Sequence, residues 1–488
     1  MAPEYDMVVI GGGAAGLTAS GMAALLGAKT ALIERRKLGG DCTWFGCVPS
    51  KTLLRAARAA HEIRTADRFG LAAREPHFDF SKLMEHVRQT RNRIYQDADA
   101  PPHMQALGVE VLAGRARFLD PHTLEVTQEE KVLRRLSSRF FIVATGSRPK
   151  MPGFAEPVLT NETIFELQSR PDRLVVIGAG PVGIEMAQAF TRLGSRVDLV
   201  APADHILARD DPKHAVMLQE CLHREGVVFH LGHKVTALNR GESGLTAALD
   251  DGSTLVCDAA LAAMGREPVF EELDLESAGV KVEEKGIRID SHCRTSQPHI
   301  YAAGDVTGKY DFTHMAEHMS KVAVTNAILR WPANLDARHV VASTFTDPEL
   351  AHLGESEAEL HHRKATFHEY RFSFDKLDRA ITDAATEGEV KVFADRAGRI
   401  LGVSILGANA GEMISEYALA MRNGLRLPDI AKTIHPYPTF LLGNRRLADQ
   451  HTARYLDSPF LGLLGRILGY RGVRKGAAAL IHPDRRDQ

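Results

Sequence analysis

Cysteine is scarce in this chain of 488 residues, which contains only five. Disulfide-stabilised extracellular domains are far richer in cysteine, so the sequence excludes a disulfide framework. Long hydrophobic runs are also missing, because no stretch of about 18 or more apolar residues could form a membrane-spanning helix. The N-terminal residues "MAPEYDMVVIGGG" lack the basic segment and apolar run of a signal peptide. From these absences we expect a cytoplasmic protein.

Charge of one sign is not in excess either. The chain has 60 lysines and arginines against 62 aspartates and glutamates, with a net charge of −2. Without a basic surplus, no bulk attraction to nucleic acid or to a membrane is expected. The hydrophobic share of 44% and the charged share of 25% are typical of a soluble globular protein. At roughly 100–200 residues per domain, the length suggests about three domains.

A dinucleotide-binding motif opens the chain at "DMVVIGGGAAGLTA". The apolar run 7–10 predicts a buried strand, the glycines have Rossmann spacing, and "LTASGMAALLG" continues as a helix. Such glycines allow a tight turn and let the backbone approach a pyrophosphate at the helix N-terminus. A second strand, "TALIE", ends in an acid that is expected to bind ribose hydroxyls. The expected binding residues are Gly11, Gly13, Ala14, Ala15, Gly16 and Glu34.

The same pattern recurs at "RLVVIGAGPVG", which a helix, "IEMAQAFTRLG", and a strand, "RVDLV", follow. Here the second strand ends at Ala201 and Pro202, without the acid that favours NAD(H). This leaves room for a 2′-phosphate, which His205 or Arg209 could bind, and favours NADPH over NADH. The alternative is that both residues are solvated surface groups. Two dinucleotide sites in one chain indicate a flavin and a nicotinamide. The expected residues of the second site are Gly178, Gly180, Pro181, Val182 and Gly183.

A close cysteine pair, Cys42 and Cys47, lies in "GGDCTWFGCVPSK" directly before a predicted helix, "SKTLLRAARAAHEI". The positive end of a helix dipole lowers the pKa of a thiol and favours the thiolate. The pair therefore indicates redox chemistry. Zinc binding is the alternative, but the other three cysteines are scattered without metal-ligand spacing.

With these motifs the sequence resembles the class I flavoprotein disulfide reductases, which include glutathione reductase, dihydrolipoamide dehydrogenase and mercuric reductase. The resemblance covers roughly residues 5–455. It rests on "GGDCTWFGCVPSK", "ATGSRP", "MGREP", "YAAGDV", "FTDPELAHLG" and "ILGANAGEMISEYALAM".

The resemblance implies an α/β fold with two Rossmann-like domains, for FAD and NAD(P), and an α+β dimerisation domain at the C-terminal end. It also implies a homodimer in which each active site uses the partner's C-terminal domain. The implied division is a flavin domain (1–155 and 274–336), a nicotinamide domain (156–273), a dimerisation domain (337–456) and a tail (457–488). FAD and either NADPH or NADH are the implied cofactors.

Site residues follow from the same resemblance. Cys47 would be the thiolate beside the flavin, and Cys42 the interchange thiol that meets the substrate. Lys51 would lie by flavin N5, paired with Glu185, because a cation there stabilises the negative charge of the reduced flavin. Further cofactor contacts are implied for Gly40, Asp41, Ala144, Thr145, Gly146, Gly265, Arg266, Gly304 and Asp305.

One departure concerns the catalytic base. Disulfide-reducing members carry a histidine, then Pro-Thr, then a glutamate three residues after the Thr, and the histidine serves as acid and base. In "TIHPYPTFLLGNRRLAD", Tyr437 takes the place of that histidine and Leu442 the place of the glutamate. Tyrosine has a pKa of about 10 and is a poor proton shuttle at neutral pH. His435 is a candidate substitute base.

With a tyrosine at this position the sequence resembles mercuric reductase, which also has a tyrosine there. In mercuric reductase the thiol pair binds a soft metal ion. We therefore expect an NAD(P)H oxidoreductase that reduces Hg(II) or another thiol-reactive acceptor. The alternatives are a disulfide reductase without the usual histidine, and a non-catalytic flavin redox sensor or membrane-associated partner. Three features differ from mercuric reductase: no metal-carrying module precedes the flavin domain, the C-terminus lacks a vicinal cysteine pair, and Trp44 and Phe45 separate the active cysteines. Those two side chains either shape the substrate pocket or pack within the flavin domain.

The tail after Asp457 mixes apolar and basic residues and could form an amphipathic segment on a membrane surface. Gly462, Gly465, Gly469 and Gly472 disfavour a stable helix there. We therefore expect the tail to pack on the dimer or to stay partly disordered, rather than to contact a membrane.

Overall fold

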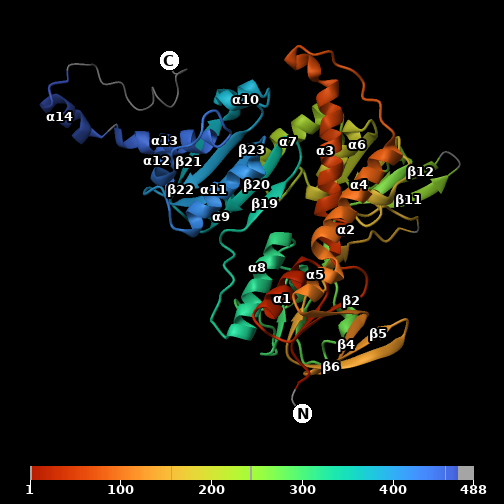
Figure 1. Cartoon of the computed structure of the whole chain (residues 1–488). Coiled ribbons are helices and arrows are strands. Elements are labelled where there is room, and N and C mark those ends of the chain that lie inside the picture. The colour runs from red at the N-terminus through yellow and green to blue at the C-terminus, as the bar shows by residue number, and fades with distance from the viewer. Residues whose placement is uncertain (1–2, 155, 242–243, 457, 471–488) are drawn as a thin grey trace. The chain divides into compact units, whose positions relative to one another are not determined.

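The computed structural model describes residues 3–154, 156–241, 244–456 and 458–470 and divides into two compact units (Figure 1). The first unit is built from the chain up to Asp204 and from Glu225–Ala337, and the second from His205–Arg224 and the chain from Arg338 onward. Our finer division of the chain into flavin, nicotinamide and dimerisation domains stays a prediction. No helix among the described residues is long and apolar enough to cross a membrane.

The first sheet of the first unit has the parallel order β3-β2-β1-β6, with β18 beside β6. The strands are β1 (Tyr5–Ile10), β2 (Thr30–Glu34), β3 (Val109–Ala113), β6 (Lys131–Val143) and β18 (Ile300–Ala302). The N-terminal half of β6 leaves this parallel arrangement and pairs antiparallel with β5 (Thr123–Gln128), which pairs with β4 (Arg115–Asp120). The apolar runs predicted as buried strands, in β1 and β2, are confirmed.

Helices α1 (Ala14–Leu25) and α8 (Thr313–Val324) share the hydrophobic core of this sheet. Small side chains such as Ala19 and Ala23 on α1 are fully buried, which lets the helix approach the strands closely. The glycine turn between β1 and α1 is therefore held between a buried strand and a buried helix.

A second parallel sheet in the same unit has the order β10-β9-β8-β14. Its strands are β8 (Arg173–Ile177), β9 (Arg196–Ala201), β10 (Val228–Leu231) and β14 (Ala259–Ala262). Helix α6 (Pro181–Arg192) follows β8, as the repeated motif predicted. An antiparallel sheet, β11-β12-β13, packs its apolar side chains in a common core with β8 and β9. Its strands are β11 (Val235–Gly241), β12 (Gly244–Leu249) and β13 (Thr254–Cys257).

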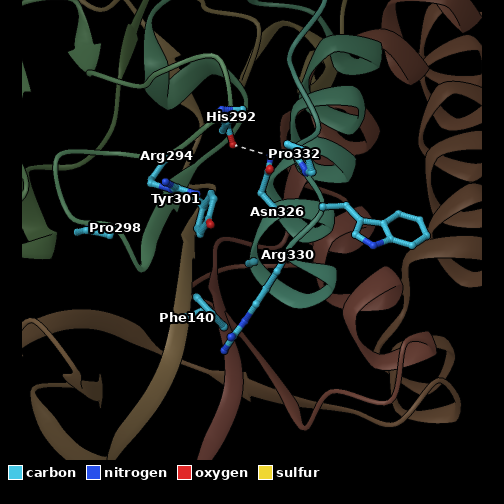
Figure 2. Close-up of a pocket in the computed structure, with 10 residues that line it drawn as sticks. Phe140, His292, Arg294, Pro298, Tyr301, Asn326, Arg330 and Pro332 are labelled. Carbon is cyan, nitrogen blue, oxygen red and sulfur yellow. Dashed lines mark hydrogen bonds between the residues drawn. The ribbon is translucent and has the colours of Figure 1, made fainter.

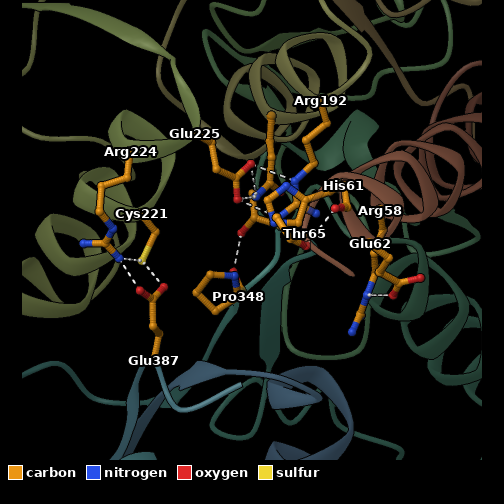
Figure 3. Close-up of polar contacts among 12 residues, drawn as sticks. Arg58, His61, Glu62, Thr65, Arg192, Cys221, Arg224, Glu225, Pro348 and Glu387 are labelled. Atoms are coloured by element: carbon orange, nitrogen blue, oxygen red, sulfur yellow. Dashed lines mark hydrogen bonds and ion pairs between the residues drawn. The ribbon is translucent and has the colours of Figure 1, made fainter. Parts of the chain in front are cut away.

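A nearly buried ion pair fixes the end of α6. Arg192, whose side chain is 4% exposed, donates from Nε and Nη2 to the two carboxylate oxygens of Glu225 at 2.7 and 2.6 Å (Figure 3). Arg64 of α3 (Cys47–Arg64) donates to the Arg192 carbonyl at 3.0 Å. A bidentate pair of this kind is geometrically specific, so it holds α6 in one orientation in the first unit.

The second unit is built on an antiparallel sheet of order β19-β20-β23-β22-β21. The strands are β19 (Val341–Thr344), β20 (Glu349–Gly354), β21 (His368–Ser373), β22 (Glu389–Ala394) and β23 (Ile400–Gly407). Helices α11 (Ala410–Arg422) and α13 (Leu442–Leu456) cover it and contribute to one core. The second unit also contains all but the last residue of α7 (Pro212–Glu225), a helix that the sequence places between β9 and β10.

Buried charges fasten α7 to this sheet. The ammonium of Lys391, which is fully buried, donates to both carboxylate oxygens of Asp211 at 2.7 and 2.6 Å. Asp211 in turn accepts from the backbone N–H groups of Lys213 and His214 and so caps the helix. His214 is also fully buried, between the Ser404 hydroxyl at 2.7 Å and a Glu389 carboxylate oxygen at 3.2 Å.

Near the other end of α7, the Cys221 thiol donates to a carboxylate oxygen of Glu387 at 2.9 Å, and Arg224 pairs with the same carboxylate (Figure 3). Both ends of the α7 segment in the second unit are therefore bound through polar contacts.

One sequence prediction was wrong. The start of the tail forms a helix, α14 (Pro459–Ile467), although its glycines were expected to disfavour a stable one. Residues 471–488 of the tail, with Gly472, lie outside the described residues. Ser458 caps the helix by accepting the Leu461 N–H at 3.3 Å, and Pro459 begins it with a preset φ angle.

Lys391→Met is expected to lower the free energy of unfolding of the second unit by about 3–5 kcal/mol, because it removes the ammonium that pairs with the buried Asp211 carboxylate. Burial alone would raise the pKa of Asp211, but Lys391 and His214 outweigh burial and lower it. The folded carboxyl therefore contributes stability above about pH 4 that is lost on acidification, and the difference between the two proteins should shrink below that pH. Urea denaturation at several pH values measures both effects.

The matched control is Arg399→Met, which removes an exposed partner 3.9 Å from Asp395. In this variant the free energy of unfolding should fall by less than about 1 kcal/mol. Equal losses in the two variants would contradict the role given to the Asp211–Lys391 pair.

Candidate active site

The first glycine turn has room for glycine alone at two positions. Gly11 has φ +104°, and a Cβ there would lie 2.3 Å from the Ala144 carbonyl oxygen. A Cβ on Gly16 would lie 1.7 Å from the Gly11 carbonyl oxygen. Gly13 is the N-cap of α1 and no side chain caps the helix, so backbone N–H groups of its first turn are left for an anionic ligand. Ala14 and Ala15 are in this first turn. The turn therefore fits the pyrophosphate of a dinucleotide such as FAD.

Glu34 completes this turn. One of its carboxylate oxygens accepts the Gly12 N–H at 2.6 Å and the other accepts the Arg36 N–H at 2.6 Å. Gly12 was not among the predicted residues, yet a Cβ there would lie 2.4 Å from Leu38 Cδ2. Gly40, with φ +58°, presses against the same turn, because its Cβ would lie 2.6 Å from the Gly13 Cα. The start of the cysteine segment thus contacts the dinucleotide turn.

Two motifs far apart in the chain meet in a two-stranded ribbon. Strand β7 (Ser147–Pro149), from "ATGSRP", pairs antiparallel with β15 (Arg266–Pro268), from "MGREP". Arg266 donates to the Ser147 hydroxyl at 2.7 Å and forms an ion pair with Asp41 at 3.0 Å. Glycines with positive φ flank both strands: Gly146 (+71°) and Gly265 (+103°). The Thr145 hydroxyl donates to the Val269 carbonyl.

Asp305 joins this ribbon. Its carboxylate accepts the Ser147 hydroxyl at 2.6 Å, and burial raises the pKa of the carboxyl group. Gly304, with φ +79°, precedes it. Ser147 was missed by the sequence analysis because its two partners lie more than 100 residues further along the chain, at separations of 119 and 158 positions.

The two cysteines lie on consecutive helices. Cys42 is half-buried in α2 (Gly40–Trp44), and Cys47 is exposed as the first residue of α3. Both are free thiols in this structure, and the Thr313 hydroxyl lies 3.6 Å from Cys47 Sγ. A hydrogen bond from Cys42 lowers the pKa of Cys47 to about 6, with further contributions from Thr313 and the Lys51 charge. The same hydrogen bond and burial raise the pKa of Cys42.

This asymmetry gives the two sulfurs different roles at neutral pH. Cys47 carries the negative charge at a helix N-terminus, and Cys42 keeps its proton. Trp44 between them is buried, with its indole N–H donating to the Leu38 carbonyl at 2.7 Å, so it packs within the unit. Phe45 is half-buried.

Lys51 and Glu185 form the ion pair that the resemblance implied. Lys51, one turn after Cys47 on α3, donates to both carboxylate oxygens of Glu185 on α6, at 3.0 and 2.8 Å. The Glu185 side chain is only 5% exposed, and that of Lys51 is 37% exposed. The partly exposed Lys51 side chain is thus held by a buried carboxylate.

The second glycine turn repeats the geometry of the first. Gly178 has φ +116°, and its Cβ would lie 2.3 Å from the Ala263 carbonyl oxygen. A Cβ on Gly183 would lie 2.0 Å from the Gly178 carbonyl oxygen. Gly180 is the N-cap of α6, without a side-chain cap, and Pro181 and Val182 follow in the first turn. This turn fits a second dinucleotide. His205 and Arg209 fall in the second unit, and their role toward a 2′-phosphate stays a prediction.

In the second unit, His435 is enclosed. Its side chain is 4% exposed, with Nε2 2.8 Å from a Glu416 carboxylate oxygen and Nδ1 3.0 Å from the Thr433 carbonyl oxygen. Both ring nitrogens therefore face acceptors within the unit. Tyr437 is 70% exposed, and a hydrogen bond to Asp378 raises the pKa of its hydroxyl. Leu442, in the position of the missing glutamate, is buried in the core.

A pocket of about 470 Å³ lies elsewhere in the first unit (Figure 2). Its lining includes Tyr301, Asn326 and Arg330 but none of the predicted site residues. Asn326 accepts the Ala333 N–H at 3.1 Å and donates to the His292 carbonyl at 3.3 Å, which fixes the loop on one side of the pocket. Among the described residues, no group of three or more His, Cys, Asp or Glu side chains could hold a metal ion.

Comparison with known proteins identifies this arrangement. The family described as "pyridine nucleotide-disulphide oxidoreductase" matches residues 5–320, and its dimerisation domain matches residues 340–443. The chain belongs to the pyridine nucleotide-disulphide oxidoreductase family. Members of this family bind FAD and use NAD(P)H, and the matched dimerisation domain indicates a homodimer.

Two kinds of oxidoreductase are among its similar relatives. A mercuric reductase from Streptomyces lividans is 35% identical over 449 residues, which cover 89% of this chain and 94% of the relative. A dihydrolipoyl dehydrogenase from Thermus scotoductus is 36% identical over 459 residues, which cover 91% of this chain and 97% of the relative. Overall identity therefore does not separate metal reduction from disulfide chemistry.

Solved structures of the family show the same fold. LpdA from Mycobacterium tuberculosis superposes with a TM-score of 0.86 at 27% identity, covering 91% of this chain and 99% of that structure. The HOCl-induced flavoprotein disulfide reductase RclA from Escherichia coli gives a TM-score of 0.82 at 26% identity, covering 91% of this chain and 99% of that structure. The Cu(II) complex of RclA also matches. The predicted α/β fold with a C-terminal dimerisation domain is confirmed.

In the reduced protein, alkylation of Cys47 by iodoacetamide should follow a titration with its midpoint at about pH 6. Thr313→Val and Lys51→Met should each move that midpoint upward, because each removes a group that stabilises the thiolate. Mass spectrometry of the Cys47 peptide at a series of pH values measures the midpoint.

Thr52→Val is the matched control, because the Thr52 hydroxyl donates to the Val48 carbonyl on the same helix. It should leave the midpoint unchanged. A wild-type midpoint of about 8.5, the value of an ordinary thiol, would contradict the proposed assignment of charge to Cys47.

Proposed function

We propose that this protein is an NAD(P)H oxidoreductase that passes electrons through FAD and the Cys42–Cys47 pair to a soft metal ion such as Hg(II), or to another thiol-reactive acceptor. The proposal rests on two features that occur together: one of the two thiols is charged at neutral pH, and the position of the histidine base holds another residue. Cys47 has its pKa lowered to about 6, while Tyr437 stands where disulfide-reducing relatives carry a histidine.

The surroundings of Tyr437 and His435 support this choice of acceptor. Asp378 raises the pKa of the Tyr437 hydroxyl, so the hydroxyl keeps its proton at neutral pH. His435 is buried, and its ring nitrogens face Glu416 and Thr433. Neither residue is therefore suited to exchanging protons with a substrate thiol.

Proton balance distinguishes the two reactions. Reduction of a disulfide by NAD(P)H takes up one proton and yields two thiols, so the leaving sulfur needs an acid. Reduction of Hg(II) by NAD(P)H yields the metal atom, NAD(P)⁺ and one released proton. No leaving sulfur of the substrate has to be protonated in the second reaction, and a site without the histidine can carry it out.

Each chain residue has a role in this scheme. When bound, FAD accepts a hydride from the nicotinamide and supplies the electron pair for reduction. The glycine turns at Gly11–Gly16 and Gly178–Gly183 would hold the two dinucleotides by their phosphates. Lys51, fixed by Glu185, would place a positive charge beside the flavin, and Cys42 would meet the acceptor. Thiolates are the ligands that soft metals prefer.

Two relatives give this acceptor class further support. One is named a mercuric reductase, and the RclA structure was solved as a Cu(II) complex. The runner-up is reduction of a small or protein disulfide, which the dihydrolipoyl dehydrogenases among the relatives favour. We also propose NADPH over NADH as donor, because β9 ends at Ala201 without a ribose-binding acid.

Purified, FAD-loaded protein is expected to oxidise NADPH with thiol-chelated Hg(II) and to turn over lipoamide and glutathione disulfide poorly. Cys42→Ala should reduce Hg(II) turnover at least about 100-fold, because it removes the thiol that meets the metal. Following nicotinamide oxidation with each acceptor, and with NADPH and NADH separately, measures this. Rapid disulfide turnover by the wild-type protein would contradict the proposal.

Tyr437→His should increase turnover with a disulfide by about 100-fold or more, because it supplies the missing proton donor and acceptor. The matched control, Tyr437→Phe, removes the hydroxyl without adding a base and should give no increase. His435→Ala should leave Hg(II) turnover within about threefold of the wild type. If His435→Ala instead abolishes a disulfide activity of the wild type, His435 is the substitute base and the runner-up function holds.

A further inference from the structure

Helix α14 exposes all five of its large apolar side chains, and its C-cap residue Leu468 is exposed as well. All six are more than one third exposed, and the most exposed are Phe460 at 70% and Ile467 at 72%. The set is Phe460, Leu461, Leu463, Leu464, Ile467 and Leu468. Soluble proteins rarely leave so continuous an apolar surface in water, and such surfaces mark contact sites.

These side chains share one face of the helix. At about 100° per residue they fall within an arc of about 160°, with Phe460 and Leu464 nearest its centre line and Leu463 at one edge. Arg466 lies on the opposite arc, and Gly462 and Gly465 also lie outside the apolar arc. The glycines therefore do not interrupt the apolar face.

The charge of the segment has one sign. From Ser458 to Pro483 the sequence contains Arg466 and, beyond the described residues, Arg471, Arg474 and Lys475, and no aspartate or glutamate. Since the chain as a whole has a net charge of −2, this is a local excess of positive charge. An apolar face combined with clustered basic residues is the pattern of helices that lie on anionic membrane surfaces.

The matched dimerisation domain does not include this helix, because the match ends at residue 443 and α14 begins at Pro459. The apolar face therefore lies outside the part of the chain that the dimerisation domain matches.

We propose that α14 docks on the surface of an anionic lipid bilayer, with Phe460, Leu463 and Ile467 inserted at the boundary between headgroups and acyl chains. The basic residues of the segment bind the phosphate groups of the lipids. Docking needs no membrane-spanning helix, and it brings the oxidoreductase to the membrane surface without taking part in the chemistry.

Sedimentation of the full-length, FAD-loaded protein with lipid vesicles tests the proposal. The protein should bind vesicles that contain phosphatidylglycerol, bind phosphatidylcholine vesicles more weakly, and lose part of the difference as salt is added. Leu463→Glu/Ile467→Glu should lower the partition coefficient at least about tenfold, because two apolar contacts are replaced by charges that the lipid repels. Replacing Arg471, Arg474 and Lys475 by glutamine should weaken binding to phosphatidylglycerol by roughly fivefold per charge.

The matched control is Leu25→Glu, which changes an apolar residue of α1 that is 73% exposed and should leave vesicle binding unchanged. Nicotinamide oxidation that is equal in Leu463→Glu/Ile467→Glu and in the wild type shows that the variant is folded. Vesicle binding that is absent, or that survives this double substitution, overturns the proposal. The proposal is also overturned if the double variant loses self-association in sedimentation velocity while the wild type ignores vesicles, because α14 then covers a second copy of the chain.

Discussion

The ion pair between Lys51 and Glu185 is the constraint on which the rest of the site depends. Glu185 is almost fully buried, and a buried carboxylate without a counter-ion is strongly unfavourable. Its partner lies on α3, one turn after Cys47, while Glu185 itself lies in the helix that begins at the second glycine turn. One contact therefore fixes the thiol-bearing helix against the helix that would hold the nicotinamide dinucleotide. The same ammonium contributes to the low pKa of Cys47.

Local patterns in the sequence predicted the parts of this site that depend on neighbouring residues. The strands at Met7–Ile10 and Thr30–Glu34, both glycine turns and the helix after the cysteines follow from periodicity and from positions at which only glycine fits. The resemblance to known reductases added Lys51 and Glu185, which are 134 positions apart. Contacts without a local signal were missed, among them Thr313 beside Cys47, at a separation of 266 positions.

Two further features of the structure were not predicted. The tail was expected to pack on the dimer or to stay partly disordered because its glycines disfavour a stable helix, but Ser458 and Pro459 start a helix there. The grouping of α7 with the second unit was also not predicted. Its connections to β9 and β10 indicate a nicotinamide-domain helix, yet buried contacts of Asp211 and His214 bind it to β22 and β23. Periodicity identifies a helix, and long-range charges decide what it packs against.

The central claim is that Cys42 and Cys47 form a redox relay between the flavin and the acceptor. Anaerobic titration of the FAD-loaded, oxidised protein with NADPH tests it most directly, with thiols counted at the end point. The account predicts uptake of one electron pair by the flavin and a second by the cysteine pair, with two new thiols appearing, and loss of the second pair in Cys42→Ala. Uptake of a single electron pair by the wild-type protein, with no new thiols, would contradict it and leave the flavin alone to reduce the acceptor.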